Sequence, residues 1–213
     1  LDGFDLGVGI LLPLEQKDNA DTMIASIGPF WDANETWLVL AIGLLLIAFP
    51  AAHSYIFKEL YFPTAVLLIS LVLRGVAFDF RAKAAFSHKP TWNRVFKGGS
   101  LIASLSQGYM LGMYVMGFES TLMAYSFSLL SAFGVAAAYS YIGACWLIMK
   151  TEGDLQIQAV AWAQKSGLIC FIGVIAVSLV NPLINPDVYA KWFSSSNAYI
   201  FLPLPIICFA LFI

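Results

Sequence analysis

The sequence carries little charge for its length. Charged residues make up 11% of its 213 residues and hydrophobic residues 60%, whereas an average soluble domain has roughly 25% charged residues. So few charged side chains cannot cover a globule with a surface that faces water. The formal net charge of −2 also leaves no basic face to neutralise phosphates, which excludes nucleic acid as a partner.

Cysteine and histidine are scarce as well. Cys145, Cys170 and Cys208 each stand alone in an apolar run, so neither a zinc site nor a disulfide framework is predicted. Haem iron needs axial ligands such as His, Met or a Cys thiolate. The only histidines are His53 and His88, which cannot serve a multi-haem centre. We therefore expect this chain to bind no metal.

Long apolar runs dominate what is present. A bilayer-spanning helix needs about 20 mostly apolar residues, and this length predicts an all-α polytopic transmembrane helix bundle with about seven spans, forming one domain over residues 1–213. The sequence begins and ends inside apolar runs, so we expect a piece of a longer chain, truncated at both ends. The spans are expected at 1–13 (the end of a helix), 36–57, 61–80, 99–118, 126–149, 166–184 and 198–213.

Basic residues fall on alternate loops of this pattern. The positive-inside rule places the more basic side in the cytoplasm. A short helix within 18–31, ended by Pro29, is expected at that cytoplasmic surface. Lys17, Arg81, Lys83, Lys89, Arg94, Lys97, Lys150 and Lys165 are expected on the cytoplasmic side, and Lys58 and Lys191 on the other.

Ionisable residues inside spans are costly, so each one is a functional hypothesis. Asp2 and Asp5 lie three residues apart, on one face of the first helix. Arg74 lies within a predicted span and needs a carboxylate partner. Asp79 lies about 140° away around the same helix, so we expect Asp2 or Asp5 to pair with Arg74.

Some of the charged residues also have a purely structural explanation. Asp32 could be a helix N-cap, with Glu35 as its partner three residues on. Arg81 and Lys83 could be interfacial anchors. Lys83 lies four residues after Asp79 and could form only a salt bridge within the helix.

Three polar motifs within apolar surroundings point to one family. They are LDGFDLGVGI at 1–10, GPFWDANETWLV at 28–39 and LRGVAFDFRAK at 73–83. In this order and spacing the chain resembles subunit II of cytochrome bd-type ubiquinol oxidases, including the cyanide-insensitive branch. The resemblance is specific over the first ~85 residues, and the rest agrees in hydrophobic layout.

The resemblance implies a multi-pass subunit of a respiratory-chain enzyme in the bacterial inner membrane, with eight or nine spans in the full chain. It implies a heterodimer with subunit I, which binds two b-type haems and one d-type haem. The complex oxidises quinol and reduces oxygen to water with cytoplasmic protons, while subunit II itself ligates no haem. A bound ubiquinone, membrane lipid and small accessory subunits are further expected partners.

The resemblance also assigns residues. The aspartates of the second and third motifs, Asp32 and Asp79, are implied in the proton pathway from the cytoplasm to the oxygen-reducing haem. Trp31 and Asn34 are expected beside this pathway. An interior charge network is expected to include Asp2, Asp5, Arg74 and Arg81.

Two other functional classes fit the same charges. A secondary transporter or ion channel would use the intramembrane carboxylates to bind an ion and would act without a partner. The sequence shows neither inverted repeats nor matching broken spans, which such a protein would favour. A purely structural membrane anchor would tolerate neutralisation of Asp32 and Asp79 together.

Overall fold

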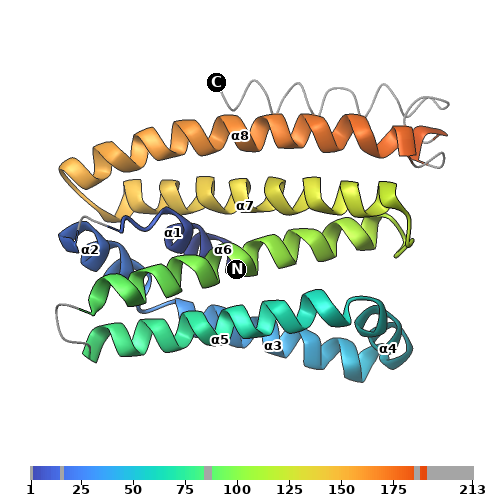
Figure 1. The fold of residues 1–213 in the computed structure, drawn as a ribbon, viewed down its shortest axis with the longest axis horizontal. Coiled ribbons are helices and arrows are strands. Elements are labelled where there is room, and N and C mark those ends of the chain that lie inside the picture. Colours follow the sequence, from blue (N-terminus) through green and yellow to red (C-terminus); the bar gives the residue numbers. More distant parts are fainter. Residues whose placement is uncertain (1, 15–16, 84–87, 185–187, 191–213) are drawn as a thin grey trace. The chain divides into compact units, whose positions relative to one another are not determined.

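The computed structural model describes residues 2–14, 17–83, 88–184 and 188–190, and every regular element within these ranges is a helix (Figure 1). The all-α prediction is therefore confirmed for the described part. The chain divides into two compact units, residues 1–173 and 174–213. The helices are α1 (Gly3–Leu11), α2 (Lys17–Ile27), α3 (Trp31–Ala48), α4 (Pro50–Glu59), α5 (Tyr61–Lys83), α6 (Lys89–Val115), α7 (Leu122–Lys150) and α8 (Asp154–Ile184).

Four of these helices, α3, α5, α7 and α8, are long and apolar enough to cross a membrane. Helix α6 has sufficient length, with 27 residues, but serines, glycines and Gln107 lower its hydropathy. Helices α1 and α4 have 9 and 10 residues, too few to cross alone. The predicted span at 198–213 lies outside the described residues. The count of about seven spans is thus not confirmed.

The predicted continuous span at 36–57 is wrong, because the helix breaks at Phe49. Helix α3 ends at Ala48, and Phe49 has a non-helical backbone with φ −137° and ψ 62°. Pro50 follows as the first residue of α4. A proline ring lacks an N–H and collides with the preceding helical turn, whereas the first position of a helix tolerates it.

Two helices begin well before the apolar runs that predicted them. Helix α6 begins at Lys89 and α8 at Asp154, whereas the sequence predicted spans from 99 and from 166. Segments that contain polar residues, such as Lys89 and Arg94 in α6 and Gln156 in α8, extend each helix beyond the apolar run. At 1.5 Å per residue, the 31 residues of α8 extend about 46 Å, longer than the ~30 Å hydrocarbon core.

Within residues 1–173, the basic helix ends gather at one end of the bundle. Figure 1 shows α2, the end of α5, the start of α6, the end of α7 and the start of α8 together there. Helix α4 and the turn between α6 and α7 lie at the opposite end (Figure 1). We call these the basic end and the far end.

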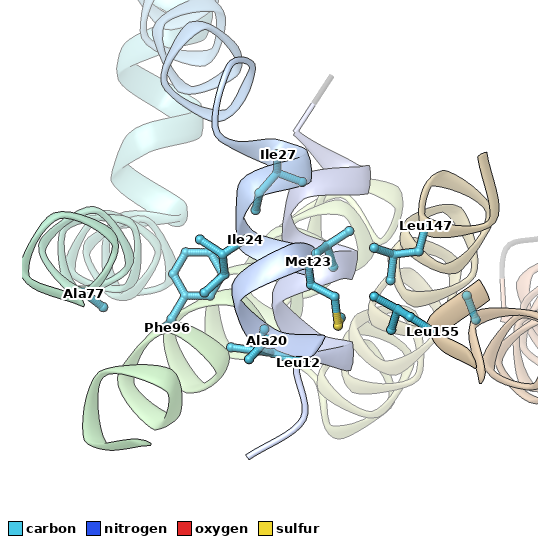
Figure 2. Packing of buried hydrophobic residues seen from close by; sticks show 11 residues of the cluster. Leu12, Ala20, Met23, Ile24, Ile27, Ala77, Phe96, Leu147 and Leu155 are labelled. Carbon is cyan, nitrogen blue, oxygen red and sulfur yellow. The ribbon is translucent and has the colours of Figure 1, made fainter. Parts of the chain in front are cut away.

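The apolar residues of α2 are covered by protein rather than left at the surface. Met23 and Ile27 are fully buried, and Ile24 nearly so. Figure 2 shows them between Phe96 of α6 and Leu147 of α7. The predicted short helix is therefore present, ends at Ile27 before Pro29, and closes the basic end of the core.

Glycines allow α1 and α7 to meet backbone to backbone. A Cβ placed on Gly143 would lie 2.5 Å from the carbonyl carbon of Gly7 and from the nitrogen of Val8. A Cβ on Gly7 would collide with the carbonyl of Tyr139. This contact, the α1–α7 seam, resembles the small-residue contacts common between membrane helices.

A polar cluster joins α2 to α5 and α6 at the basic end. Arg81, which is 6% exposed, donates through Nε to Asn93 Oδ1 and through Nη2 to Asp21 Oδ1, each at 2.5 Å. Lys89 Nζ donates to the other oxygen of Asp21 at 3.3 Å. Arg81 is therefore buried and paired within the protein, and its role as an interfacial anchor stays a prediction. We call this group the Asp21 clasp.

Replacing Gly143 by alanine should weaken the α1–α7 seam. The added methyl group overlaps backbone atoms that cannot move aside, and such overpacking costs about 1–3 kcal/mol. We expect the apparent melting temperature of the detergent-solubilised protein to fall by roughly 5 °C. Gly134, on the same helix, has no atom within 4 Å of an added Cβ, so Gly134→Ala should lower the melting temperature much less. Equal effects of the two changes would contradict the seam.

The Asp21 clasp should lose strength in acid. Burial acts to raise the pKa of Asp21, but the hydrogen bonds and charges of Arg81 and Lys89 outweigh it, so the pKa is lowered. A carboxyl group whose pKa is lower in the folded than in the unfolded state stabilises the fold. This stabilisation is complete above the unfolded-state pKa of about 3.9 and is lost as pH falls through the folded-state pKa.

The difference in melting temperature between the unsubstituted protein and Asp21→Asn should therefore be constant from neutral pH down to about pH 5 and shrink below about pH 4. Thermal unfolding across this pH series measures it. Asp18→Asn, on the exposed side of the same helix, is the control and should change the melting temperature less. A difference that is independent of pH down to pH 3 would rule out an ionised clasp.

Candidate functional site: a buried charge cluster

Arg74 is the centre of the site. It lies on α5, is fully buried and is the largest fully buried side chain among the described residues. Aromatic rings flank its guanidinium, with Cζ 5.7 Å from the ring centroid of Trp31 and 5.2 Å from that of Phe96. Rings at these distances attract a desolvated cation, but they do not neutralise its charge.

Carboxylates from two other helices provide that compensation. Glu35 of α3 accepts a hydrogen bond from Arg74 Nη1, with a donor–acceptor distance of 2.5 Å. Asp2, at the start of α1, places Oδ1 3.8 Å from the same nitrogen. Asp5, one turn further along α1, is fully buried and accepts a hydrogen bond from Asn34 Nδ2 at 2.5 Å. The Arg74 cluster therefore joins α1, α3 and α5.

The cluster holds more acid than base. Asp2, Asp5 and Glu35 are three acids around the single guanidinium of Arg74. If all three were ionised, the group would bury excess negative charge, which is expensive in a low-dielectric interior. Both oxygens of Asp2 and Oδ1 of Asp5 are buried and accept no hydrogen bond from any described residue. Taking up a proton would reduce the excess charge, so the cluster can store one.

A ring contact places the start of α3 beside the end of α5. The rings of Trp31 and Phe78 lie with centroids 4.8 Å apart. Asp32 and Asp79 directly follow these two residues, and both are exposed. The two predicted proton-pathway aspartates therefore lie at the surface, whereas Asp2 and Asp5 are buried within the cluster.

Sequence reasoning missed Glu35 as a partner of Arg74. The glutamate was interpreted as half of a capping pair with Asp32, but α3 begins at Trp31 with Phe30 at the N-cap, and no side chain caps it. The capping interpretation is therefore wrong. The available signal was that Glu35, like Arg74, lies in a helix long and apolar enough to span a membrane.

The other predicted network residue, Arg81, does not join this cluster. It lies two turns further along α5 and belongs to the Asp21 clasp. Within the part of the chain that the structure describes, no ion pair joins Asp79 to Lys83, so the predicted helix salt bridge is not formed there. The interior charges thus fall into two separate groups.

A separate cavity of about 490 Å³ lies toward the far end. Most of its lining is apolar, including Phe62 of α5, Met113 of α6 and Leu129 of α7. Ser106 and two tyrosines, Tyr109 and Tyr125, add polar groups. Such a lining suits a long apolar chain with a small polar group.

Among the described residues, no group of three or more His, Cys, Asp or Glu side chains is placed to hold a metal ion. His53 is partly exposed on α4 and stacks on Phe57 with ring centroids 4.5 Å apart. His88 is exposed at the N-cap of α6. Helix α4, which carries His53, lies at the far end, whereas α6, which His88 precedes as N-cap, begins at the basic end (Figure 1).

This chain is similar in sequence to known bacterial proteins. A subunit 2 of cytochrome bd ubiquinol oxidase from Bacillus subtilis (strain 168) is 31% identical over 227 residues, covering 99% of this chain and 65% of that protein. A cytochrome bd-I ubiquinol oxidase subunit 2 from Escherichia coli (strain K12) is 31% identical over 188 residues, covering 80% of this chain. A probable cytochrome oxidase subunit 2 from Haemophilus influenzae is 32% identical over 194 residues.

The chain spans 65% of the length of the Bacillus protein and 50% of each of the other two. The family described as cytochrome bd terminal oxidase subunit II matches residues 1–213, which is the whole of this chain. Three motifs that place charge inside membrane helices thus occur in a sequence that matches the family along its entire length. The chain belongs to the cytochrome bd terminal oxidase subunit II family.

Proposed function

We propose that this chain works as the second subunit of a membrane-bound quinol:oxygen oxidoreductase and supplies protons to a haem site in its partner. The observation that carries the proposal is the family match over residues 1–213. Relatives named ubiquinol oxidase subunit 2 from two bacteria give the reaction class. The bacterial inner membrane is the compartment that this assignment implies.

The haems, two of b type and one of d type, would be bound by subunit I. Each haem iron needs one or two strong axial ligands. His53 is partly exposed on α4 at the far end, and His88 is exposed at the N-cap of α6, which begins at the basic end. When bound in the partner, haem supplies electron transfer and oxygen reduction. The residues described here would hold and move protons.

Proton uptake would begin at Asp32 and Asp79. Both carboxyl groups are exposed on helices that are long and apolar enough to span a membrane. Charged side chains in such helices avoid lipid and face water or protein. The contact between Trp31 and Phe78 supports this proposal, because it joins the residues that precede the two aspartates and Trp31 also lies beside Arg74.

The face for the partner would include α3. No residue of this helix is buried, although it carries exposed large apolar residues such as Trp37, Leu44 and Ile47. The apolar part of this helix is suited to face lipid. Its first turn, which carries Asp32, is suited to face protein. Subunit I is the partner that the family assignment implies.

The cavity near the far end is the place where this chain would take a quinone or lipid tail. Its volume of about 490 Å³ lies within the usual range of ligand pockets. Tyr109 and Tyr125 would provide hydroxyl groups for a polar head.

Purification through this chain should recover haem in a second, larger chain. We expect absorption bands of b-type and d-type haems in the native complex, and their loss when the larger chain is removed. Difference spectra and gel analysis of the same preparation measure both. Haem that stays with this chain after the larger chain has been separated would contradict the division of roles.

Asp32→Asn should slow oxygen reduction without removing the haems. Asparagine has similar size but cannot carry a proton, and loss of a proton-transferring group costs about a hundredfold or more in many enzymes. Turnover with quinol as electron donor should fall at least about tenfold, with the same result for Asp79→Asn. Oxygen consumption per haem measures the change.

Glu119→Gln serves as the control, because Glu119 is exposed in the turn between α6 and α7 at the far end. Its turnover should equal that of the unsubstituted complex. Unchanged turnover in Asp32→Asn and Asp79→Asn together would exclude the proton pathway and favour a purely structural subunit. Loss of haem in these variants would also contradict it.

A further inference from the structure

The exposed aspartates and the buried cluster need a connecting group. Asp32 is exposed, whereas Asp5 and Arg74 are fully buried. We propose that Glu35 carries protons between Asp32 and the carboxylates of α1. This inference rests on the proposed function, because it assigns a new member to the same pathway.

The position of Glu35 suits this role. It lies three residues after Asp32 on α3, so the two side chains share one helix face with Cβ atoms about 5–6 Å apart. Its side chain is 21% exposed, between the exposed Asp32 and the fully buried Arg74. Glu35 is therefore the acidic group that lies at the boundary between the surface and the interior.

Arg74 can change its ion-pair partner as the proton moves. Its Nη1 lies 2.5 Å from Glu35 and 3.8 Å from Asp2, so two acids compete for one donor. When Glu35 accepts a proton from the Asp32 carboxyl group, Asp32 becomes a carboxylate and the ion pair between Glu35 and Arg74 weakens. The guanidinium can then pair with Asp2.

The second transfer restores the ionised form of Glu35 and leaves the proton on α1. Neutral Glu35 passes its proton to a carboxylate of α1, Asp2 or Asp5, and becomes an anion again. The O–H bond on Glu35 breaks as a new one forms on the acceptor, and Arg74 returns to Glu35. No electron moves in either step, so the relay needs no redox partner.

Two contacts near Glu35 hold α3 in place without involving the Glu35 carboxylate. Asn34 donates to Asp5 and links α3 to α1, and the ring contact between Trp31 and Phe78 links α3 to α5. Neither depends on the charge of Glu35. Loss of that charge should therefore leave the position of α3 largely intact.

The test is steady-state oxygen consumption by the purified native complex in H₂O and in D₂O. Glu35→Gln should lower turnover at least about tenfold and increase the ratio of the rates in H₂O and D₂O, with the haem spectrum unchanged. Glu35→Asp, which keeps a carboxyl group, should recover most of the turnover. Glu119→Gln should match the unsubstituted complex in both solvents.

A second comparison excludes a purely charge-balancing role. Removing Glu35 alone leaves Arg74 with less compensation, and breaking a buried pair can prevent assembly. Arg74→Gln and Arg74→Gln with Glu35→Gln both remove the cation. If Glu35 carries protons, the double variant should be at least about tenfold slower than Arg74→Gln. Equal or faster turnover of the double variant would overturn the proposal.

The results for the Asp32 and Glu35 variants together distinguish a failure of the Glu35 relay from a failure of the proposed function. If Asp32→Asn slows turnover and loss of the Glu35 carboxyl group does not, the proton pathway stands and Glu35 is not part of it. If neither substitution slows turnover, the proposed function itself fails. If both slow turnover and Glu35→Asp recovers it, the relay is supported.

Discussion

The folded arrangement of α1, α3 and α5 depends on the compensation of one buried cation. Arg74 is fully buried, and a guanidinium in a membrane interior costs at least a few kcal/mol unless it is paired. Glu35 and Asp2 provide that pairing from two other helices. Removing one partner of a buried pair typically costs about 3–5 kcal/mol. The ion pair of Glu35 with Arg74 shares the attachment of α3 with the hydrogen bond from Asn34 to Asp5 and the ring contact between Trp31 and Phe78.

The helical class and the burial of Arg74 followed from the sequence because both depend on local physics. Apolar length predicts helices, and an arginine within an apolar run must find a carboxylate. The expected bounds of α5 and α7 agreed closely with the structure. The starts of α6 and α8 did not, because hydropathy marks the lipid-facing segment whereas the helix continues beyond it.

The partner of Arg74 could not be identified with the same ease. Glu35 lies 39 residues from Arg74 in the sequence, and a local rule assigned it to a cap. Which of several carboxylates approaches Arg74 depends on the rotation of three helices about their axes, which no local pattern specifies. Arg81 shows the same limit, because its partner Asp21 is 60 residues away. The break at Phe49 was a local signal, since Pro50 was visible in the sequence.

The α1–α7 seam also bears on the side from which the charge cluster would exchange protons in the proposed pathway. With Gly7 against the backbone of Tyr139 and Gly143 against Gly7, no gap remains between these two helices for a file of water molecules. The seam therefore excludes water from one side of α1, the helix that carries Asp5. In the proposed pathway, exchange would take place on the side of α3, where Glu35 is partly exposed. In a membrane that stores energy as a proton gradient, access from one side alone would limit the proton leak that a buried acid could otherwise create.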